Sequence, residues 1–167
     1  MRYNTLSMIC LPAVLLVATV LLHDRPQNPP TERERSIETA LNVPPPVQDM
    51  LRRACYDCHS SETRWPWYAR VPPLAGRIEH DVARGRAVMN FSEWTVSAGA
   101  SPARAAGTLS AACAAVQRGI MPKPPYPYLH PEARLSKDDI DSFCAWTREE
   151  AAVLGATARR RSAGPQP

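Results

Sequence analysis

The sequence predicts an all-α fold, and three observations support this prediction. Apolar residues recur at intervals of three and four along several segments, which is the spacing of one helix face. No stretch alternates apolar and polar residues over the length of a strand. The 18 prolines cluster between the periodic segments, and the chain has only 2 phenylalanines. We therefore expect helices joined by long loops around a small core built from aliphatic residues.

Four segments are expected to form the helices of the domain. The third begins at Ser101-Pro102, because serine caps a helix start and proline suits its first turn. The fourth begins after Ser136, because Asp139 completes a capping box with this serine. The expected helices span residues 46–54, 73–89, 102–118 and 137–154.

The amino-terminal segment is typical of a membrane anchor. Residues 5–22 contain no charge, and at helical rise they would span about 27 Å, close to the thickness of a bilayer's hydrocarbon core. A cleaved signal peptide is the alternative, although no small-x-small cleavage site follows Leu22. We expect four parts: a signal anchor or transmembrane helix over residues 1–23, a proline-rich charged linker over 24–43, a helical domain over 44–154 and a disordered tail over 155–167.

The charge distribution argues against a nucleic-acid partner. The formal net charge is +4, and charges of both signs are mixed along the chain. No glycine-rich phosphate loop is present. The anchor, by contrast, implies contact with a membrane and places the domain on the far side of it.

The stretch CYDCH, Cys55 to His59, carries the strongest chemical signal. Thiol–disulfide chemistry would require a strand before the motif, and zinc would require a second ligand pair at short spacing; neither is visible. Covalent haem attachment fits better, because two thiols with two residues between them match the two vinyl groups, and the adjacent histidine can bind iron. We expect one haem c, held by Cys55 and Cys58, with His59 as the proximal iron ligand.

The second axial ligand is expected to be Met121. It follows Gly119, where a helix ends, and precedes Pro122 in a proline-rich loop, which restricts the backbone in the way that a weak thioether ligand requires. His130 in the same loop is the main alternative. Other candidates have simpler roles as core or solvent-exposed side chains: Met50, Met89 and His80.

Two further groups of residues complete the expected site and core. Trp65, Trp67 and Tyr68 follow the motif closely and could pack on a flat apolar ring. Cys113 and Cys144 lie on the inward faces of two neighbouring predicted helices. In an oxidising compartment they are candidates for a disulfide, with two buried free cysteines as the alternative.

Several long blocks of the sequence resemble a known family. The blocks are CYDCHSSETRWPWY, NFSEW, the G-x-MP turn and LHPEARLS, and together they lie within about residues 44–150. They are similar to the bacterial haem-binding domain family of small c-type cytochromes. The resemblance implies a monohaem, periplasm-facing, helical domain with a cytochrome c-like fold, and it carries the haem roles to Cys55, Cys58, His59 and Met121. The chain departs from the family pattern near Leu74-Ala75-Gly76.

Taken together, these features predict a membrane-tethered electron carrier. The chain would be a single-pass inner-membrane protein whose haem domain faces the periplasm and exchanges single electrons with redox partner proteins. A haem-based sensor or gas-binding module, with a labile or absent sixth ligand, is the alternative. We do not expect an enzyme, because a peroxidase-like site would need an open distal pocket and usually a second haem.

Overall fold

The structure is helical throughout the part that it describes. The computed structural model describes residues 10–12, 14–15, 17–19 and 26–164, and no strand occurs among them. The all-α prediction is therefore confirmed. Helices joined by short 3-10 turns (η) run in this order: η1 Arg33–Arg35, α2 Ile37–Ala40, α3 Pro45–Ala54, α4 Tyr56–His59, η2 Trp67–Arg70, α5 Leu74–Val88, η3 Phe91–Val96, η4 Ala98–Ala100, α6 Pro102–Gln117, α7 Tyr126–Leu129, η5 Pro131–Ala133 and α8 Lys137–Ala163.

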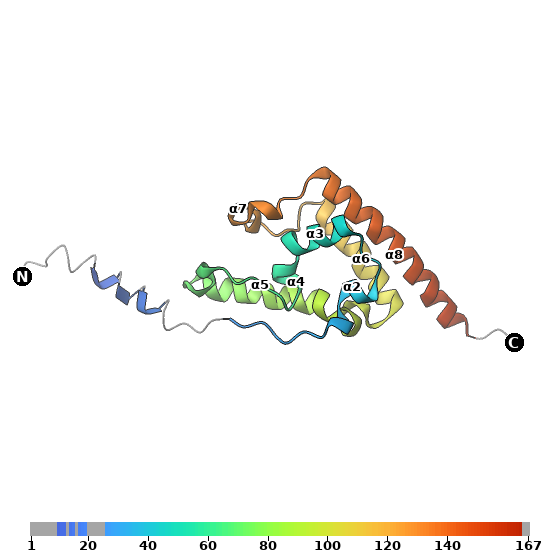
Figure 1. Cartoon of the computed structure of the whole chain (residues 1–167), viewed down its shortest axis with the longest axis horizontal. Helices are drawn as coiled ribbons and strands as arrows, with labels where there is room; N and C mark the ends of the chain where they lie inside the picture. Colours follow the sequence, from blue (N-terminus) through green and yellow to red (C-terminus); the bar gives the residue numbers. More distant parts are fainter. Residues whose placement is uncertain (1–9, 13, 16, 20–25, 165–167) are drawn as a thin grey trace, which may run out of the picture.

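Helices α6 and α8 pack side by side and form one half of the domain (Figure 1). Both begin as the sequence predicts. The Ser101 side chain accepts a hydrogen bond from the Arg104 amide, and Ser136 and Asp139 form a capping box. The buried core of this half includes Leu109 and Val116 on α6 and Phe143 and Trp146 on α8.

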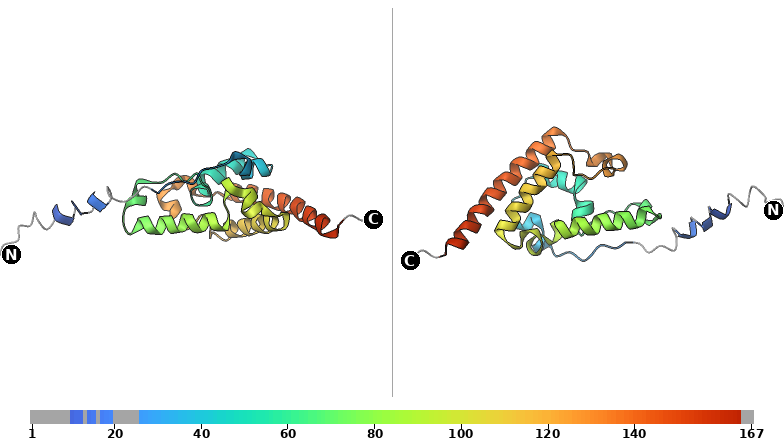
Figure 2. Two further views of the ribbon diagram at one scale, coloured as in Figure 1. Left: turned by 90° about the horizontal axis from the view of Figure 1, so that it is seen from below. Right: turned by 180° about the vertical axis from the view of Figure 1, so that it is seen from behind.

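Helices α4 and α5 form the other half, which carries the CYDCH motif. Helix α3 connects the halves: its buried side chains join the core, and its last residue is followed directly by Cys55. Figure 2 shows α5 and α8 as the two long arms of the molecule, with α6 packed along α8. The motif thus lies at the junction between the apolar core and α5.

The segment predicted as a linker is packed onto the domain. Ile37 is fully buried and Val43 nearly so, and both belong to the core. Arg35 forms an ion pair with Glu93. Further upstream, the side chain of Asn28 bonds three parts of the domain: the Thr63 carbonyl, the Trp65 indole and the Arg86 guanidinium. The predicted linker over residues 24–43 is corrected to a segment that is docked from Asn28 onward.

The predicted disordered tail is also corrected. Helix α8 continues through the expected break at residue 155 and ends at Ala163. The tail is rich in alanine and arginine, which favour helix, and lengthening an existing helix avoids the cost of nucleation. In Figure 1 this last part of α8 extends away from the other helices.

The predicted membrane segment falls largely outside the described residues. Among the residues described, no helix is both long enough and apolar enough to cross a bilayer. Most of residues 1–23 do not belong to the described set, so the expected anchor stays a prediction.

Candidate functional site

The CYDCH motif forms a tight helical turn at the start of α4. Cys55 ends α3, and its carbonyl oxygen accepts hydrogen bonds from the amides of Cys58 and His59, at 3.2 and 2.9 Å. Residues three and four positions apart on a helical turn share one face. The turn therefore presents both thiols and the imidazole on the same side. Neither Cys55 nor Cys58 is in a disulfide.

The His59 ring is oriented by a backbone carbonyl. Its Nδ1 lies 3.2 Å from the Met89 carbonyl oxygen. Since a carbonyl can only accept, Nδ1 carries the proton and Nε2 keeps its lone pair. Burial lowers the pKa of His59, despite opposing hydrogen bonds to the Met89 and Gly85 carbonyls. A neutral imidazole whose second nitrogen is bonded to a carbonyl is the usual form of a histidine ligand.

Helix α5 approaches the motif closely at Gly85. A Cβ atom at this position would lie 2.4 Å from the Cys58 carbonyl oxygen and 3.0 Å from its carbonyl carbon. Both atoms belong to the backbone and cannot rotate away. The motif turn and α5 can therefore touch only because residue 85 has no side chain.

Asp57, inside the motif, links it to two distant segments. Its buried carboxylate accepts bonds from the Arg64 amide and guanidinium, at 2.9 to 3.2 Å. It also accepts a bond from the Tyr126 hydroxyl at 2.6 Å. Burial, and then the bond to Asp57, raises the pKa of Tyr126, so the phenol stays protonated and donates. One carboxylate thus holds α4, the segment after it and α7 together.

The proline-rich loop before α7 is held against α5 and η2. Lys123 pairs with Asp81 on α5 at 2.6 Å. The His130 ring stacks on Tyr126, and its Nε2 lies 2.6 Å from the Tyr68 hydroxyl while its Nδ1 lies 3.3 Å from Glu132. Both ring nitrogens of His130 have partners, so neither is free to bind iron.

These segments enclose a cleft of about 200 Å³ with mainly apolar walls. Cys58 and Tyr68 line it; of the remaining predicted site residues, Cys55, His59, Trp65, Trp67 and Met121 do not. The volume is below the ~300–1,000 Å³ usual for ligand clefts, so its present walls cannot enclose a whole porphyrin. The walls come from α4, η2, α5 and the loop with α7, and include Leu74, Ile78, Val82, Pro124, Pro125 and Leu129.

The other candidate ligands occupy different surroundings. The side chains of Met50 and Met89 are buried in the core, with 1% and 8% exposed, and His80 is solvent-exposed. Met121 is half-buried at the edge of the core. Its amide and that of Ile120 both donate to the Ala115 carbonyl, which fixes the start of the loop to the end of α6.

The aromatic residues after the motif have separate roles. The Trp65 indole donates to Asn28, and the Arg86 guanidinium lies over its ring. Tyr68 bonds His130 and lines the cleft. Trp67 points outward, with 74% of its surface exposed.

The surroundings of the motif argue against thiol redox chemistry. Burial is the main cause that raises the pKa of Cys55 to about 12 and that of Cys58 to about 11. Reactive thiols have lowered pKa values, because the thiolate is the nucleophile. No group of three or more metal-binding side chains comes together in the part of the chain that the structure describes.

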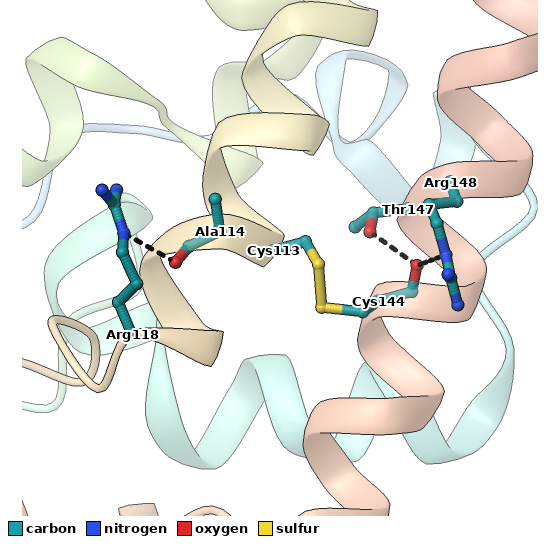
Figure 3. The surroundings of a disulfide bond; sticks show 6 residues. All are labelled: Cys113, Ala114, Arg118, Cys144, Thr147 and Arg148. Atoms are coloured by element: carbon teal, nitrogen blue, oxygen red, sulfur yellow. Dashed lines mark hydrogen bonds between the residues drawn. A yellow bond between two sulfur atoms is a disulfide. The ribbon is translucent and has the colours of Figure 1, made fainter.

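Cys113 and Cys144 form a disulfide between α6 and α8 (Figure 3). The sulfurs are 2.01 Å apart and the Cα atoms 5.1 Å. The Cys144 carbonyl also accepts bonds from Thr147 and Arg148 on the next turn of α8. This pair lies in the α6–α8 half and has no part in the cleft.

A comparison with known protein families identifies the chain. A family model described as a haem-binding domain matches residues 13–149. The chain belongs to this haem-binding domain family. The match begins upstream of residue 44, in agreement with the docked segment that precedes α3. No curated protein and no solved structure matches the chain.

The residues of a haem-binding domain are present at the motif. The turn offers two free thiols three positions apart, an imidazole whose Nδ1 lies against the Met89 carbonyl, and an apolar wall beside Cys58. This set fits haem as the cofactor. Three contributors were missed at the sequence level: Asp57, Gly85 and Tyr126. Only Asp57 had a local signal, since it is a charged residue enclosed by the motif itself.

Proposed function

We propose that the chain is a membrane-tethered, periplasm-facing c-type cytochrome that transfers single electrons. Cys55 and Cys58 bind one haem through thioether bonds, His59 binds the iron through Nε2, and Met121 is the second axial ligand. The partners are redox proteins in the periplasm or at the membrane. The anchor is the apolar segment over residues 5–22.

The observation that carries this proposal is the hydrogen bond between His59 Nδ1 and the Met89 carbonyl, at 3.2 Å. It sets the tautomer and the ring orientation before any metal is bound. Together with the two thiols on the same turn, it supports a proximal ligand next to a covalently attached ring.

Met121 is supported by the surroundings of its competitors. His130 has partners at both nitrogens, His80 is exposed, and the other candidate methionines are in the core. Met121 is at the start of a loop that is fixed at one end by Ala115 and further along by the Lys123–Asp81 pair. A weak thioether ligand requires a backbone held in this way.

The location is supported by the disulfide. Structural disulfides are common in oxidising compartments and rare in the cytoplasm. Covalent haem attachment likewise takes place outside the cytoplasm, so the two cysteine pairs favour the same compartment. A tether confines a carrier near its partners and raises their effective concentration.

In this proposal the haem supplies the redox chemistry, and the protein binds and orients it. Bound haem supplies an iron that cycles between two oxidation states with no bond made or broken in a substrate. Cys55 and Cys58 would hold the ring, and the Met89 carbonyl would keep the imidazole of His59 oriented. Near the motif, the Tyr126 hydroxyl donates a hydrogen bond to the Asp57 carboxylate, so these two groups are already engaged with each other.

Spectra of the holoprotein test the ligand set. The full chain is produced with a c-haem maturation system, as wild type, Met121→Ala and the control Met89→Leu. We expect a low-spin wild type with the weak near-red sulfur–iron band in the ferric form and no carbon monoxide binding in the ferrous form. Met121→Ala loses the band and binds carbon monoxide, whereas Met89→Leu keeps both wild-type properties.

The opposite result would favour the sensor reading. If the wild type is high-spin or binds carbon monoxide readily, and Met121→Ala has the same spectrum, Met121 is not a ligand. A labile or absent sixth ligand would then make a haem-based sensor or gas-binding module the better description.

A further inference from the structure

One end of the molecule exposes an unusual set of large apolar side chains. Trp67 on η2, Leu74 at the start of α5, and Tyr128 and Leu129 on α7 are 74%, 47%, 75% and 62% exposed. We call these four residues the apolar tip. Their elements adjoin: Tyr68 on η2 bonds His130 just after α7, and Leu74 and Leu129 line the same cleft. Pro72 and Pro73, between η2 and α5, are also exposed.

The chain enters the domain from the direction of this tip. Followed from η1 back towards residue 26, it runs beside α5 in the direction of that helix's N-terminal end (Figure 1 and Figure 2). It is fixed there by Asn28, which bonds Thr63, Trp65 and Arg86. The chain is therefore fixed to the domain from Asn28 onward and not only from the start of α3.

Few residues separate the apolar segment from Asn28. The apolar segment ends at Leu22, so six residue steps separate it from Asn28. Fully extended, they span at most about 20 Å. A docked leader thus holds the domain close to whatever surface the apolar segment enters, whereas an undocked linker up to residue 43 would have let it turn freely.

The side chains of the tip suit one kind of surface. Tryptophan and tyrosine favour the interface of a bilayer, where an apolar ring and a polar group are both accommodated. Arg70 and Arg77 lie on the same two elements, η2 and α5, whereas Arg64 and Lys123 at the cleft are paired with Asp57 and Asp81. Anionic headgroups attract arginines.

We infer that the apolar tip rests on the surface of the lipid bilayer that holds the amino-terminal anchor. The domain is seated in one orientation, with η2, the start of α5 and α7 towards the membrane and the end of α8 away from it. This inference rests on the membrane anchoring in the proposed function, and it is independent of the haem ligands.

Photo-cross-linking in vesicles tests the seating. The full-length holoprotein is reconstituted into phosphatidylcholine vesicles that contain phosphatidylglycerol and a phosphatidylcholine with a diazirine in its headgroup. Co-sedimentation with the vesicles measures anchoring, and mass spectrometry of peptides locates the lipid adducts. We expect co-sedimentation, with adducts on peptides that contain Trp67, Leu74 and Tyr128.

Matched variants sharpen the result. In Trp67→Ser/Tyr128→Ser the adducts on these peptides should fall about tenfold, since tenfold corresponds to about 1.4 kcal/mol and two large interfacial side chains contribute more than that. Val153→Ser removes a side chain that is 58% exposed on α8, and it should change nothing. Both variants alter exposed residues, and the haem spectrum of each verifies that the domain is intact.

The outcomes separate the two claims. Co-sedimentation with adducts confined to residues 5–22, or spread equally over α8, would overturn the seating while the anchor stands, and would leave the tip free for a partner protein. A chain that stays in the supernatant would overturn both the anchor and the seating. Neither result would bear on covalent haem.

Discussion

The two cysteine pairs show how surroundings divide one residue type between two tasks. Cys113 and Cys144 join α6 to α8 in the apolar half, where a disulfide closes a sequence separation of 31 residues. Cys55 and Cys58 lie three positions apart on one turn and remain free, and Cys58 borders a cleft. The first pair reinforces a core that already exists. The second pair lies at the site where we propose that haem is attached.

The two halves of the domain are held together by different kinds of interaction. The α6–α8 half is built from buried apolar side chains such as Leu109 and Phe143. The half around the cleft is held by hydrogen bonds and ion pairs, two of whose donors, Arg64 and Tyr126, share the Asp57 carboxylate, and by the close contact at Gly85. We expect the cleft half to depend on its haem for stability and the α6–α8 half to be largely independent of it.

The largest effect should come from the motif cysteines. Cys55→Ser/Cys58→Ser would remove both of the proposed thioether bonds, so a denatured gel should show no haem stain at all. Cys113→Ser/Cys144→Ser is the matched control and should keep the stain. Equal staining of the two double variants would mean that the pairs do not have different tasks.

The disulfide should matter for stability alone. Its removal in Cys113→Ser/Cys144→Ser should lower the free energy of unfolding by about 3–4 kcal/mol, since it closes a loop of 31 residues. Denaturant unfolding measures the loss, and the haem spectrum before unfolding should match the wild type. A shifted spectrum would show that the two halves are more strongly coupled than the structure implies.

Two glycines on α5 allow a controlled test of the contact with the motif. Gly85→Ala places a Cβ against the Cys58 backbone and should cost about 3 kcal/mol, the upper end of overpacking effects. Gly76→Ala meets nothing within 4 Å and should stabilise the helix by up to about 1 kcal/mol. Thermal unfolding of both variants reports the difference. If Gly85→Ala is as stable as Gly76→Ala, α5 is not pressed against the motif.

Two tyrosines on α7 allow a test of the hydrogen bond between Tyr126 and the Asp57 carboxylate. Tyr126→Phe deletes the hydrogen bond to the buried Asp57 carboxylate and should cost about 2 kcal/mol. Tyr128→Phe alters a side chain that is 75% exposed, and the expected change is below about 0.5 kcal/mol. Denaturant titrations at one pH measure both. Equal losses of unfolding free energy in the two variants would show that the Asp57–Tyr126 hydrogen bond does not stabilise the fold.

The smallest predicted effect is a pH dependence in the α6–α8 half. Burial would raise the pKa of Asp139, but bonds from Arg53 and Ser136 outweigh it and hold the pKa below its usual value. A lowered native pKa stabilises the fold above the unfolded value of about 3.9, and the contribution is lost as pH falls through the native pKa. Asp139→Asn should therefore cost about 1 kcal/mol at pH 7 and less than that near about pH 2.5.

A neighbouring residue provides the control for this titration. Asp138→Asn lies on the same first turn of α8, outside the capping box, and should have little effect at either pH. The urea midpoints of the wild type, Asp139→Asn and Asp138→Asn, measured at both pH values, test the prediction. A constant difference between wild type and Asp139→Asn across pH would contradict the linkage.

Local sequence patterns predicted those features that depend only on residues close together in the chain. The starts of α6 and α8 follow from Ser101 and Ser136, and the thiol spacing indicates haem through the shape of one turn. The docking of residues 28–43 could not be predicted in this way. Its anchors, Asn28 and Ile37, are single residues in a charged, proline-rich segment, and their partners lie far along the chain.

The site was predictable only in its attachment residues. Nothing local distinguishes Gly85 from Gly76, because the difference is the Cys58 backbone on a neighbouring helix. Tyr126 likewise resembles Tyr128 in sequence, although only the first reaches Asp57. Contacts between segments decide these roles.

The most direct test of the account is the intact mass of the wild-type chain made with a c-haem maturation system. The protein is extracted with acidified organic solvent, which removes haem that is not covalently bound, and is then weighed and digested. The account predicts one haem retained per chain, on the peptide that contains Cys55 and Cys58. An unmodified mass, with haem in the organic phase, would contradict it.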